Sequence, residues 1–321
     1  MLRARVAAAG ILAALPVLLG GGLALNVHLR ERFERHEAAP SEGRFIKAGD
    51  VEFFVQELGP PQAAVVLITH GLAAWSGLWR LVLEPSCREV RCVAVDLPPF
   101  GYTSAAPALD YDRGAQARRL WALADALGAK KISIVGHSFG GGPAAEAALQ
   151  HPERIIKLVL IAPALGLDAP ASKPGLMNAL LSFPTFARFF VAATLANPLF
   201  MRSGLARFMA DPASATEEMA AVVRRPIYLR GRNAAVAEWL PRYLYGLEPG
   251  LSMDKASYAR LTMPVLLIWG DQDTTTPLPQ GRALQALIPG SRLEVLPGIG
   301  HMPQLESAAK VQELLVAHLA D

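Results

Sequence analysis

The stretch KISIVGHSFGGGPAAEAAL, residues 131–149, decides how the chain folds. Its apolar start, Lys131–Val135, predicts a buried β-strand, and its alanine-rich end, Pro143–Gln150, predicts a helix. Between them stands Gly136-His137-Ser138-Phe139-Gly140, followed by two more glycines. Glycines this dense indicate a turn in which larger side chains would collide. A G-x-S-x-G turn between a strand and a helix presents its serine, Ser138, as a nucleophile, and the helix N-terminus behind it stabilises negative charge.

The composition of the chain indicates a globular protein. It has 321 residues, of which 52% are hydrophobic, and a formal net charge of +3. This is too apolar for a disordered chain and too weakly charged to indicate a nucleic-acid partner. The two cysteines, Cys87 and Cys92, have no Cys/His spacing typical of a metal site, so no metal is expected. We expect two buried thiols, with a short-range disulfide as the alternative.

The N-terminus differs from the rest of the chain. Arg3 and Arg5 precede an uncharged apolar run, residues 6–27, that is long enough to cross a bilayer as a helix. We expect an uncleaved membrane anchor. A signal peptide cleaved near Gly22–Ala24, which would leave a secreted protein, is the alternative. The flanking charges leave the membrane side of the catalytic domain open, because arginines stand on both sides of the run. A polar linker then extends to residue 43.

Short apolar segments alternate with helical patterns after the linker. Two strands are expected around the turn at Gly49–Asp50. Near-continuous apolar runs, typical of a parallel sheet covered by helices on both faces, predict six more. The expected helices include Arg113–Leu127 and a last helix at Pro303–Leu319. The fold class is therefore α/β. The six runs are residues 63–69, 91–96, 131–135, 155–163, 263–270 and 292–298.

One long interval contains no convincing strand. Residues 165–253 are rich in Phe, Leu and Met and then in arginine, and we interpret them as a helical cap inserted into the α/β domain. The α/β core would then comprise residues 44–164 and 254–321. Helices inserted above the strand ends commonly cover a site, although they can also be ordinary packing helices.

A serine nucleophile needs a base, and the base needs an orienting carboxylate. Of the seven histidines, only His301 follows the final strand on a glycine-rich loop that can reach the strand ends. Asp273 follows the preceding strand by a short loop and is the expected acid, with Asp271 as a turn residue. A rarer arrangement takes the acid from Asp168, after an earlier strand. The expected catalytic residues are therefore Ser138, Asp273 and His301.

The tetrahedral intermediate of acyl transfer needs two backbone N–H donors. One is expected from Phe139, the residue after the nucleophile. The other is expected from Leu72, with Ala73 as the alternative, in the turn that opens at His70-Gly71. His70 is expected to shape this loop by hydrogen bonding rather than to act as a second base.

From residue 44 to the C-terminus, five motifs in this order resemble those of the α/β-hydrolase family. They are HGLAAWSGLW, DLPPFGYTS, GHSFGG, GDQDTTTP and GIGHMPQLE. The resemblance implies a sheet of eight strands, a cap between the sixth and seventh strands, and no cofactor. Pro99 departs from the family pattern, which usually has glycine there, and puts the shape of the neighbouring pocket wall in doubt. Serine at position 138 argues against the related dehalogenases and epoxide hydrolases, which resemble this chain but carry aspartate.

The expected function is a membrane-anchored serine hydrolase that cleaves a carboxylic ester, a small apolar molecule, through an acyl-enzyme. An alternative with the same catalytic residues is a carbon–carbon bond hydrolase acting on a dienoic keto acid. Its substrate carboxylate would need a cation, for which the cap offers five arginines. A third alternative is a binding module on the same scaffold. The five arginines are Arg188, Arg202, Arg207, Arg224 and Arg225.

Overall fold

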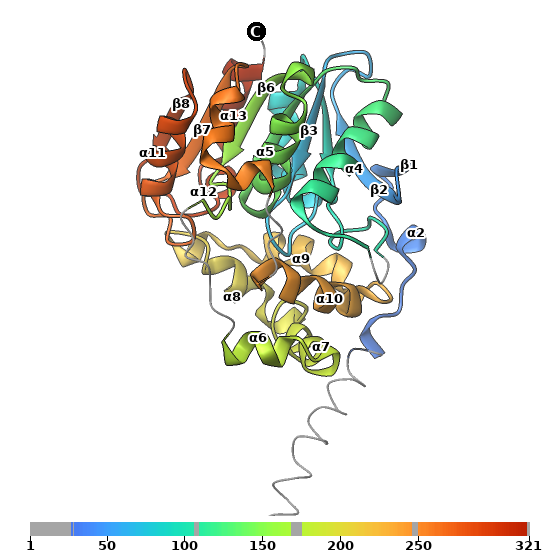
Figure 1. Cartoon of the computed structure of the whole chain (residues 1–321). Helices are drawn as coiled ribbons and strands as arrows, with labels where there is room; N and C mark the ends of the chain where they lie inside the picture. The colour runs from blue at the N-terminus through green and yellow to red at the C-terminus, as the bar shows by residue number, and fades with distance from the viewer. Residues whose placement is uncertain (1–26, 28, 106–108, 168–174, 246–249, 320–321) are drawn as a thin grey trace, which may run out of the picture.

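A computed structural model of the chain describes residue 27 and residues 29–105, 109–167, 175–245 and 250–319. Its centre is a sheet of eight strands in the order β1-β2-β4-β3-β5-β6-β7-β8 (Figure 1). The β1–β2 and β2–β4 pairs are antiparallel, and the remaining neighbours are parallel. The predicted α/β architecture, with an eight-stranded and mostly parallel sheet, is confirmed. The strands are β1 (Gly43–Ala48), β2 (Val51–Leu58), β3 (Val65–Thr69), β4 (Arg91–Val95), β5 (Ile132–His137), β6 (Ile155–Ile161), β7 (Val265–Gly270) and β8 (Arg292–Leu296).

Alternate side chains of the strands enter two separate cores, one on each face of the sheet. Leu67 and Ile134 belong to the first core, which is covered by α4 (Arg113–Ala126), α5 (Gly141–Gln150) and α11 (Leu278–Leu287). Their neighbours Ile68 and Val135 belong to the second, which is covered by α3 (Gly77–Leu83), α12 (Pro303–Glu306) and α13 (Ala308–Leu319). The central strands are therefore apolar on both faces, as their sequences predict. The strand β8 is the exception, because it forms the edge of the sheet and is only partly buried.

The prediction of one continuous C-terminal helix at Pro303–Leu319 is wrong. The structure has a short helix, α12 (Pro303–Glu306), and a longer one, α13 (Ala308–Leu319). Between them Ser307 has φ −138° and ψ 53°, which is not helical. The Glu306 side chain turns back to accept hydrogen bonds from backbone N–H groups of the preceding loop. The break therefore places a carboxylate against that loop.

The described chain between β6 and β7 consists of α-helices and 3-10 turns joined by loops, and it lies at one end of the sheet (Figure 1). Within the described residues this interval contains no strand, only a single bridge between Phe33 and Leu229. The described part of this interval is here called the cap. Its α-helices are α6 (Leu176–Leu181), α7 (Pro184–Ala193), α8 (Met201–Ala206), α9 (Glu217–Arg224) and α10 (Arg232–Tyr245).

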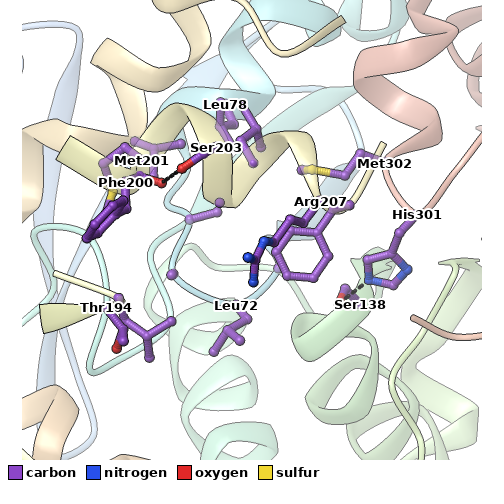
Figure 2. A pocket seen from close by; sticks show the side chains of 18 of the residues that line it. Leu72, Leu78, Ser138, Thr194, Phe200, Met201, Ser203, Arg207, His301 and Met302 are labelled. Atoms are coloured by element: carbon purple, nitrogen blue, oxygen red, sulfur yellow. Dashed lines mark hydrogen bonds between the residues drawn. The ribbon is translucent and has the colours of Figure 1, made fainter. Parts of the chain in front are cut away.

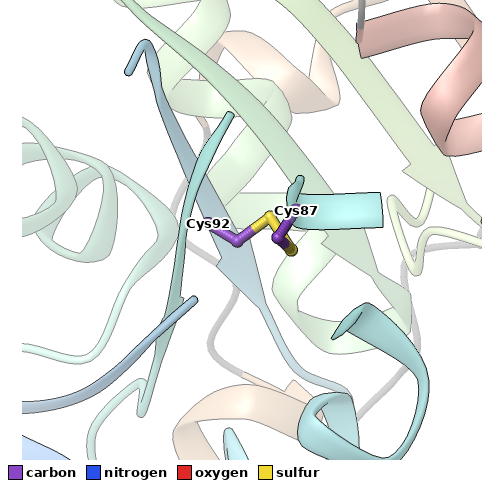
Figure 3. The surroundings of a disulfide bond; sticks show 2 residues. All are labelled: Cys87 and Cys92. Carbon is purple, nitrogen blue, oxygen red and sulfur yellow. A yellow bond between two sulfur atoms is a disulfide. The ribbon is translucent and has the colours of Figure 1, made fainter. Parts of the chain in front are cut away.

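The expectation of two separate thiols is wrong. Cys87, at the end of a 3-10 turn after α3 (Gly77–Leu83), forms a disulfide with Cys92 in β4 (Figure 3). The chain reverses direction between them and brings the two Cα atoms to 5.6 Å, within the range that a disulfide spans. The disulfide therefore links the 3-10 turn after α3 covalently to strand β4 of the sheet.

The predicted anchor at residues 6–27 lies almost wholly outside the described residues. Among the residues that the structure describes, no single helix combines the length and apolarity needed to cross a bilayer. The bent pair Pro184–Ala193 and Pro198–Ala206 passes that test only when its two parts, which meet at 45°, are taken together.

Candidate active site

Ser138 lies at the carboxyl end of the central strand β5, at the start of a 3-10 turn that leads into α5. Its φ of 50° is in the left-handed region, which a residue other than glycine adopts only under constraint. The surrounding glycines supply the constraint by close contact. A Cβ atom at Gly136 would lie 2.6 Å from the Cβ of Ala144, and one at Gly140 would lie 2.6 Å from the carbonyl oxygen of His70. The glycines of the motif are therefore needed for space.

Two hydrogen bonds connect Ser138 to the histidine and the aspartate predicted from the sequence. The Nε2 atom of His301 lies 2.8 Å from Ser138 Oγ, and its Nδ1 atom lies 2.8 Å from Asp273 Oδ2. All three side chains are buried, and they come from loops at the carboxyl ends of β5, β7 and β8. Figure 2 shows the bond between Ser138 and His301. This geometry allows His301 to take the hydroxyl proton of Ser138 while Asp273 fixes the imidazole.

Asp273 is held as a carboxylate. Burial opposes its ionisation, but hydrogen bonds from His301 and Thr276 outweigh burial and hold the pKa of Asp273 below its usual value. The Oγ1 atom of Thr276 donates to Asp273 Oδ2 over 2.8 Å, and the N–H of Thr276 donates to Oδ1 over 2.9 Å. Asp271 instead accepts from the N–H of Gly298 as a turn residue. Asp168, the alternative acid, lies outside the described residues.

The two predicted oxyanion donors are positioned near the nucleophile. No acceptor within the described part of the chain bonds the backbone N–H of Leu72 or of Phe139. Gly71 lies against Ser138, because a Cβ atom at Gly71 would be 3.4 Å from the serine Cβ. His70 shapes this loop. Its Nδ1–H donates to the carbonyl of Gly71, and its Nε2 accepts from the N–H of Leu97.

A cavity of about 450 Å³ opens above Ser138, between the sheet and the cap. Leu72, Leu78 and Met302 contribute to its core side, whereas Leu195, Phe200 and Leu205 contribute to its cap side. Figure 2 shows Arg207 extending from the end of α8 into the part of the cavity that Leu72 and Ser138 border. The cavity is thus mainly apolar, with one guanidinium near the nucleophile.

The comparisons with known proteins agree with this geometry. The family model described as the alpha/beta hydrolase fold matches residues 64–308. The chain belongs to the α/β-hydrolase family. It is 28% identical to a 2-hydroxymuconate semialdehyde hydrolase of Pseudomonas sp. (strain CF600), over 88% of this chain and 95% of the relative. It is 30% identical to a 2-hydroxy-6-oxo-6-phenylhexa-2,4-dienoate hydrolase of Burkholderia cepacia, over 81% and 89%. A solved meta-cleavage product hydrolase shares the fold with a TM-score of 0.69 and 24% identity, over 87% of this chain and 98% of its own.

Of the five arginines that the sequence suggested as carboxylate partners, the structure brings one to the cavity of this α/β hydrolase, Arg207. Arg188 lines a different cavity, Arg202 donates to the carbonyl of Ala215, and Arg224 pairs with Glu217. Arg225 is exposed and is absent from the catalytic cavity. Pro99, the departure from the family pattern, does not line that cavity either, and its carbonyl accepts from Arg232.

Three side chains that support the site of this α/β hydrolase were not found by sequence reasoning. Thr276 holds Asp273, as described above. His137 places Nε2 2.9 Å from the carbonyl oxygen of His301. Burial above all, and then the neighbouring His301, lower the pKa of His137 to about 3, so that it is neutral and its Nε2–H is the donor. The only signal for His137 in the sequence is its position directly before Ser138, and this position does not predict the contact with His301.

Glu306 is the third unforeseen residue, and it links the histidine loop to the cap. Its carboxylate accepts from the N–H groups of Gly300 and Met302, on either side of His301, and from the N–H of Ala210 in the cap, the last over 2.7 Å. The N–H of His301 itself donates to the carbonyl of Phe208 over 2.7 Å. His301, the expected general base, therefore contacts the cap through its own backbone.

No group of three or more His, Cys, Asp or Glu residues in the described part of this α/β hydrolase is arranged to hold a metal ion.

Proposed function

We propose that the chain is a serine hydrolase that forms an acyl-enzyme on Ser138. The observation that supports the proposal is the unbroken path of hydrogen bonds from Asp273 through His301 to Ser138 at the base of an apolar cavity. A serine hydroxyl with φ in the left-handed region, a buried histidine and an ionised aspartate form the arrangement that acyl transfer requires.

The reaction has two halves. His301 takes the proton of Ser138 as Oγ attacks the substrate carbonyl, and the N–H groups of Phe139 and Leu72 stabilise the oxyanion. The protonated His301 then delivers this proton to the leaving group, which departs and leaves the acyl group on Oγ. A water molecule, deprotonated by His301, attacks the acyl-enzyme. The resulting tetrahedral intermediate then collapses, which returns the proton from His301 to Ser138 Oγ and releases a carboxylic acid.

The first candidate substrate is a dienoic keto acid, the alternative of the sequence analysis. The comparisons favour it over the ester, because the two relatives described above are named as a 2-hydroxymuconate semialdehyde hydrolase and a 2-hydroxy-6-oxo-6-phenylhexa-2,4-dienoate hydrolase. Hydrolysis at a ketone must break a carbon–carbon bond, so the leaving group is carbon and is stabilised by conjugation. Arg207 supplies a cation inside the cavity that suits the substrate carboxylate.

The second candidate is an ester with an apolar acyl group. It is favoured by the lining of the cavity, which offers few free polar groups besides Arg207. The hydroxyls of Thr194 and Ser203 line the cavity but donate to the carbonyls of Phe190 and Phe200 in their own helical turns. Such walls suit an acyl chain.

One experiment separates the two candidates. Wild type and Ser138→Ala are assayed with p-nitrophenyl esters from acetate to palmitate and with a dienoic keto acid, whose visible absorbance disappears on cleavage. The Arg207→Met variant, directly after α8, is compared with Arg202→Met, which changes an arginine of α8 that does not line the cavity. For a carbon–carbon hydrolase, Arg207→Met raises the KM for the keto acid and leaves KM for neutral esters unchanged, and Arg202→Met changes neither.

Turnover of esters alone, insensitive to Arg207→Met, would support the ester hydrolase instead. A wild type that turns over neither class but reacts with a fluorophosphonate at Ser138 has the proposed nucleophile and a different substrate. Absence of both turnover and labelling contradicts the proposed serine mechanism and favours the binding module.

A further inference from the structure

The outer segments of the cap expose large apolar side chains. Of the eleven exposed in the described part of the chain, six lie between residues 176 and 200. Leu199 is 84% exposed, Leu176 is 78% exposed and Phe183 is 64% exposed. Exposed apolar residues are normally scattered singly over a soluble protein, and a concentration of them marks an interaction surface. The six, here called the cap patch, are Leu176, Met177, Phe183, Phe189, Leu199 and Phe200.

The charged residues of the segment that carries the cap patch have one sign, although Glu34 and Glu238 of other segments share a cavity with Arg188. Residues 175–210 contain three arginines, Arg188, Arg202 and Arg207, and no lysine, aspartate or glutamate. An isologous contact between two copies would bring these cations together without any acidic residue of the segment to neutralise them. A surface of anionic phospholipid headgroups attracts such a segment, and its apolar side chains suit the boundary between headgroups and acyl chains.

The N-terminal residues that the structure describes lie against the cap. The N–H of Arg230 donates to the carbonyl of Phe33, and the carboxylate of Glu31 accepts from the N–H groups of Gly231 and Asn233 in the cap. In Figure 1 the first described residues lie near α7, at the end of the molecule that is farthest from the C-terminus. The uncharged run of residues 6–27 therefore ends at the cap. The proposed anchor would hold the cap, and not the opposite end of the sheet, at a membrane.

The cap patch also reaches the catalytic cavity. Phe200 is 54% exposed and lines the cavity together with Met201. Phe200 therefore belongs both to the exposed patch and to the wall of the cavity that contains Ser138.

We propose that the cap patch lies on an anionic lipid bilayer, so that the mouth of the catalytic cavity opens at the lipid surface. This inference names a partner surface and does not depend on which bond the enzyme cleaves.

The test uses single labels on the full chain. Its only two cysteines form the disulfide, so an introduced cysteine can be labelled selectively with an environment-sensitive fluorophore. The labelled variants are Leu199→Cys and Leu176→Cys. The control is Lys131→Cys, an exposed residue that directly precedes β5, at the amino ends of the parallel strands. Each is reconstituted into vesicles of equal parts phosphatidylcholine and phosphatidylglycerol, with or without a lipid that carries a spin-label quencher.

We expect the emission of Leu199→Cys and Leu176→Cys to shift to the blue and to be largely lost when the quenching lipid is present. Lys131→Cys should show neither change. Three results would overturn the proposal. The first is equal quenching of the emission at all three sites. The second is a blue shift of the two patch labels without quenching by the lipid, which would mean that another part of the chain covers the patch. The third is cross-linking of Leu199→Cys between two copies of the protein.

A second measurement uses unlabelled protein. Phe183 and Leu199 do not line the catalytic cavity, so Phe183→Ser with Leu199→Ser should leave turnover of a soluble substrate unchanged. The same pair should lower turnover of a substrate carried in the vesicles. Equal loss with both substrates, or no loss with either, contradicts the docking of the cap. Because the labelling assay needs no turnover, it can succeed or fail independently of the proposed function.

Discussion

The two walls of the catalytic cavity are built differently. The core wall carries the proposed reacting groups, and its catalytic side chains have defined partners, including both nitrogens of His301 and both oxygens of Asp273. The cap wall carries apolar side chains, one guanidinium and hydroxyls that bond only their own helical turns. Chemistry therefore depends on one wall and the fit of the substrate on the other. The contrast can be tested by changing each wall separately.

The largest effect is expected from Ser138→Ala on the core wall. Removal of the nucleophile should lower kcat by about 10⁶-fold, as for other serine enzymes of this type. Loss of fluorophosphonate labelling together with an unchanged circular dichroism spectrum would show that chemistry and not folding is lost. A variant that keeps a tenth of the activity would mean that Ser138 is not the nucleophile.

Asp273→Asn should have the next largest effect. An amide can present an N–H to His301 Nδ1 and so stabilise the wrong tautomer, which costs about 10⁴-fold in kcat in comparable triads. The matched control is Asp271→Asn, which changes the exposed turn aspartate two residues earlier. Steady-state kinetics of both variants measure the two values of kcat. Equal losses of kcat would assign the role of the acid to neither position.

Gly71→Ala tests the space next to the oxyanion donors. The new Cβ would lie 2.8 Å from His137 Nδ1 and would displace the loop that carries the N–H of Leu72. We expect kcat to fall by about 10²–10³-fold, the cost of losing one oxyanion donor, while KM changes little. The control is Gly175→Ala, where a Cβ meets nothing within 4 Å. Unchanged kcat in Gly71→Ala would remove Leu72 from the oxyanion site.

Glu306→Gln tests the connection between the two walls. An amide retains one acceptor oxygen, so at least one of the three backbone N–H groups loses its partner, at a cost of about 1–3 kcal/mol in the free energy of unfolding. If the connection also positions His301, kcat falls as well, and the pH profile of kcat changes shape. The control Glu313→Gln removes an exposed carboxylate that pairs with Lys310. A loss of stability without any change in kcat or its pH profile would make the role of Glu306 purely structural.

The last prediction concerns stability rather than catalysis, through its dependence on pH. His137 has a pKa of about 3 in the folded protein, against an ordinary value of 6.5. Between these values the unfolded chain binds a proton that the folded one does not, so folding stability falls as the pH drops from 6.5 towards 3. His137→Gln, which can still donate to the carbonyl of His301, should reduce this slope. Urea midpoints at several pH values measure it, with the exposed His151→Gln as control. Equal slopes in wild type and His137→Gln would contradict the prediction.

The features that could be predicted from the sequence are those whose residues are close in sequence or follow neighbouring strands. The elbow around Ser138 is local, because the contacts that demand Gly136 and Gly140 involve the strand, the turn and the helix of one short segment and the neighbouring strand end. The central strands are buried on both faces of the sheet, so their sequences are near-continuous apolar runs, which predict strands. His301 and Asp273 could be chosen because both follow strands that end at the same edge of the sheet.

The features that the sequence did not predict are long-range. Glu306 meets the N–H of Ala210 across 96 residues, and no pattern in either segment indicates the contact. The break at Ser307 and the hydrogen bond from His137 to His301 likewise require the folded loop. The disulfide was missed for a different reason, since the spacing of Cys87 and Cys92 permits a bond but only the reversal of the chain between them brings the cysteines together.

The links from the cap to the histidine loop have a consequence for how such a protein can change during evolution or engineering. The cap side of the links consists of the carbonyl of Phe208 and the N–H of Ala210, which are backbone groups. Almost any side chain could replace these two residues without removing the hydrogen bonds. The path of the backbone there cannot change freely. A cap exchanged between relatives would transfer its substrate preference only if it reproduced that path, whatever its sequence.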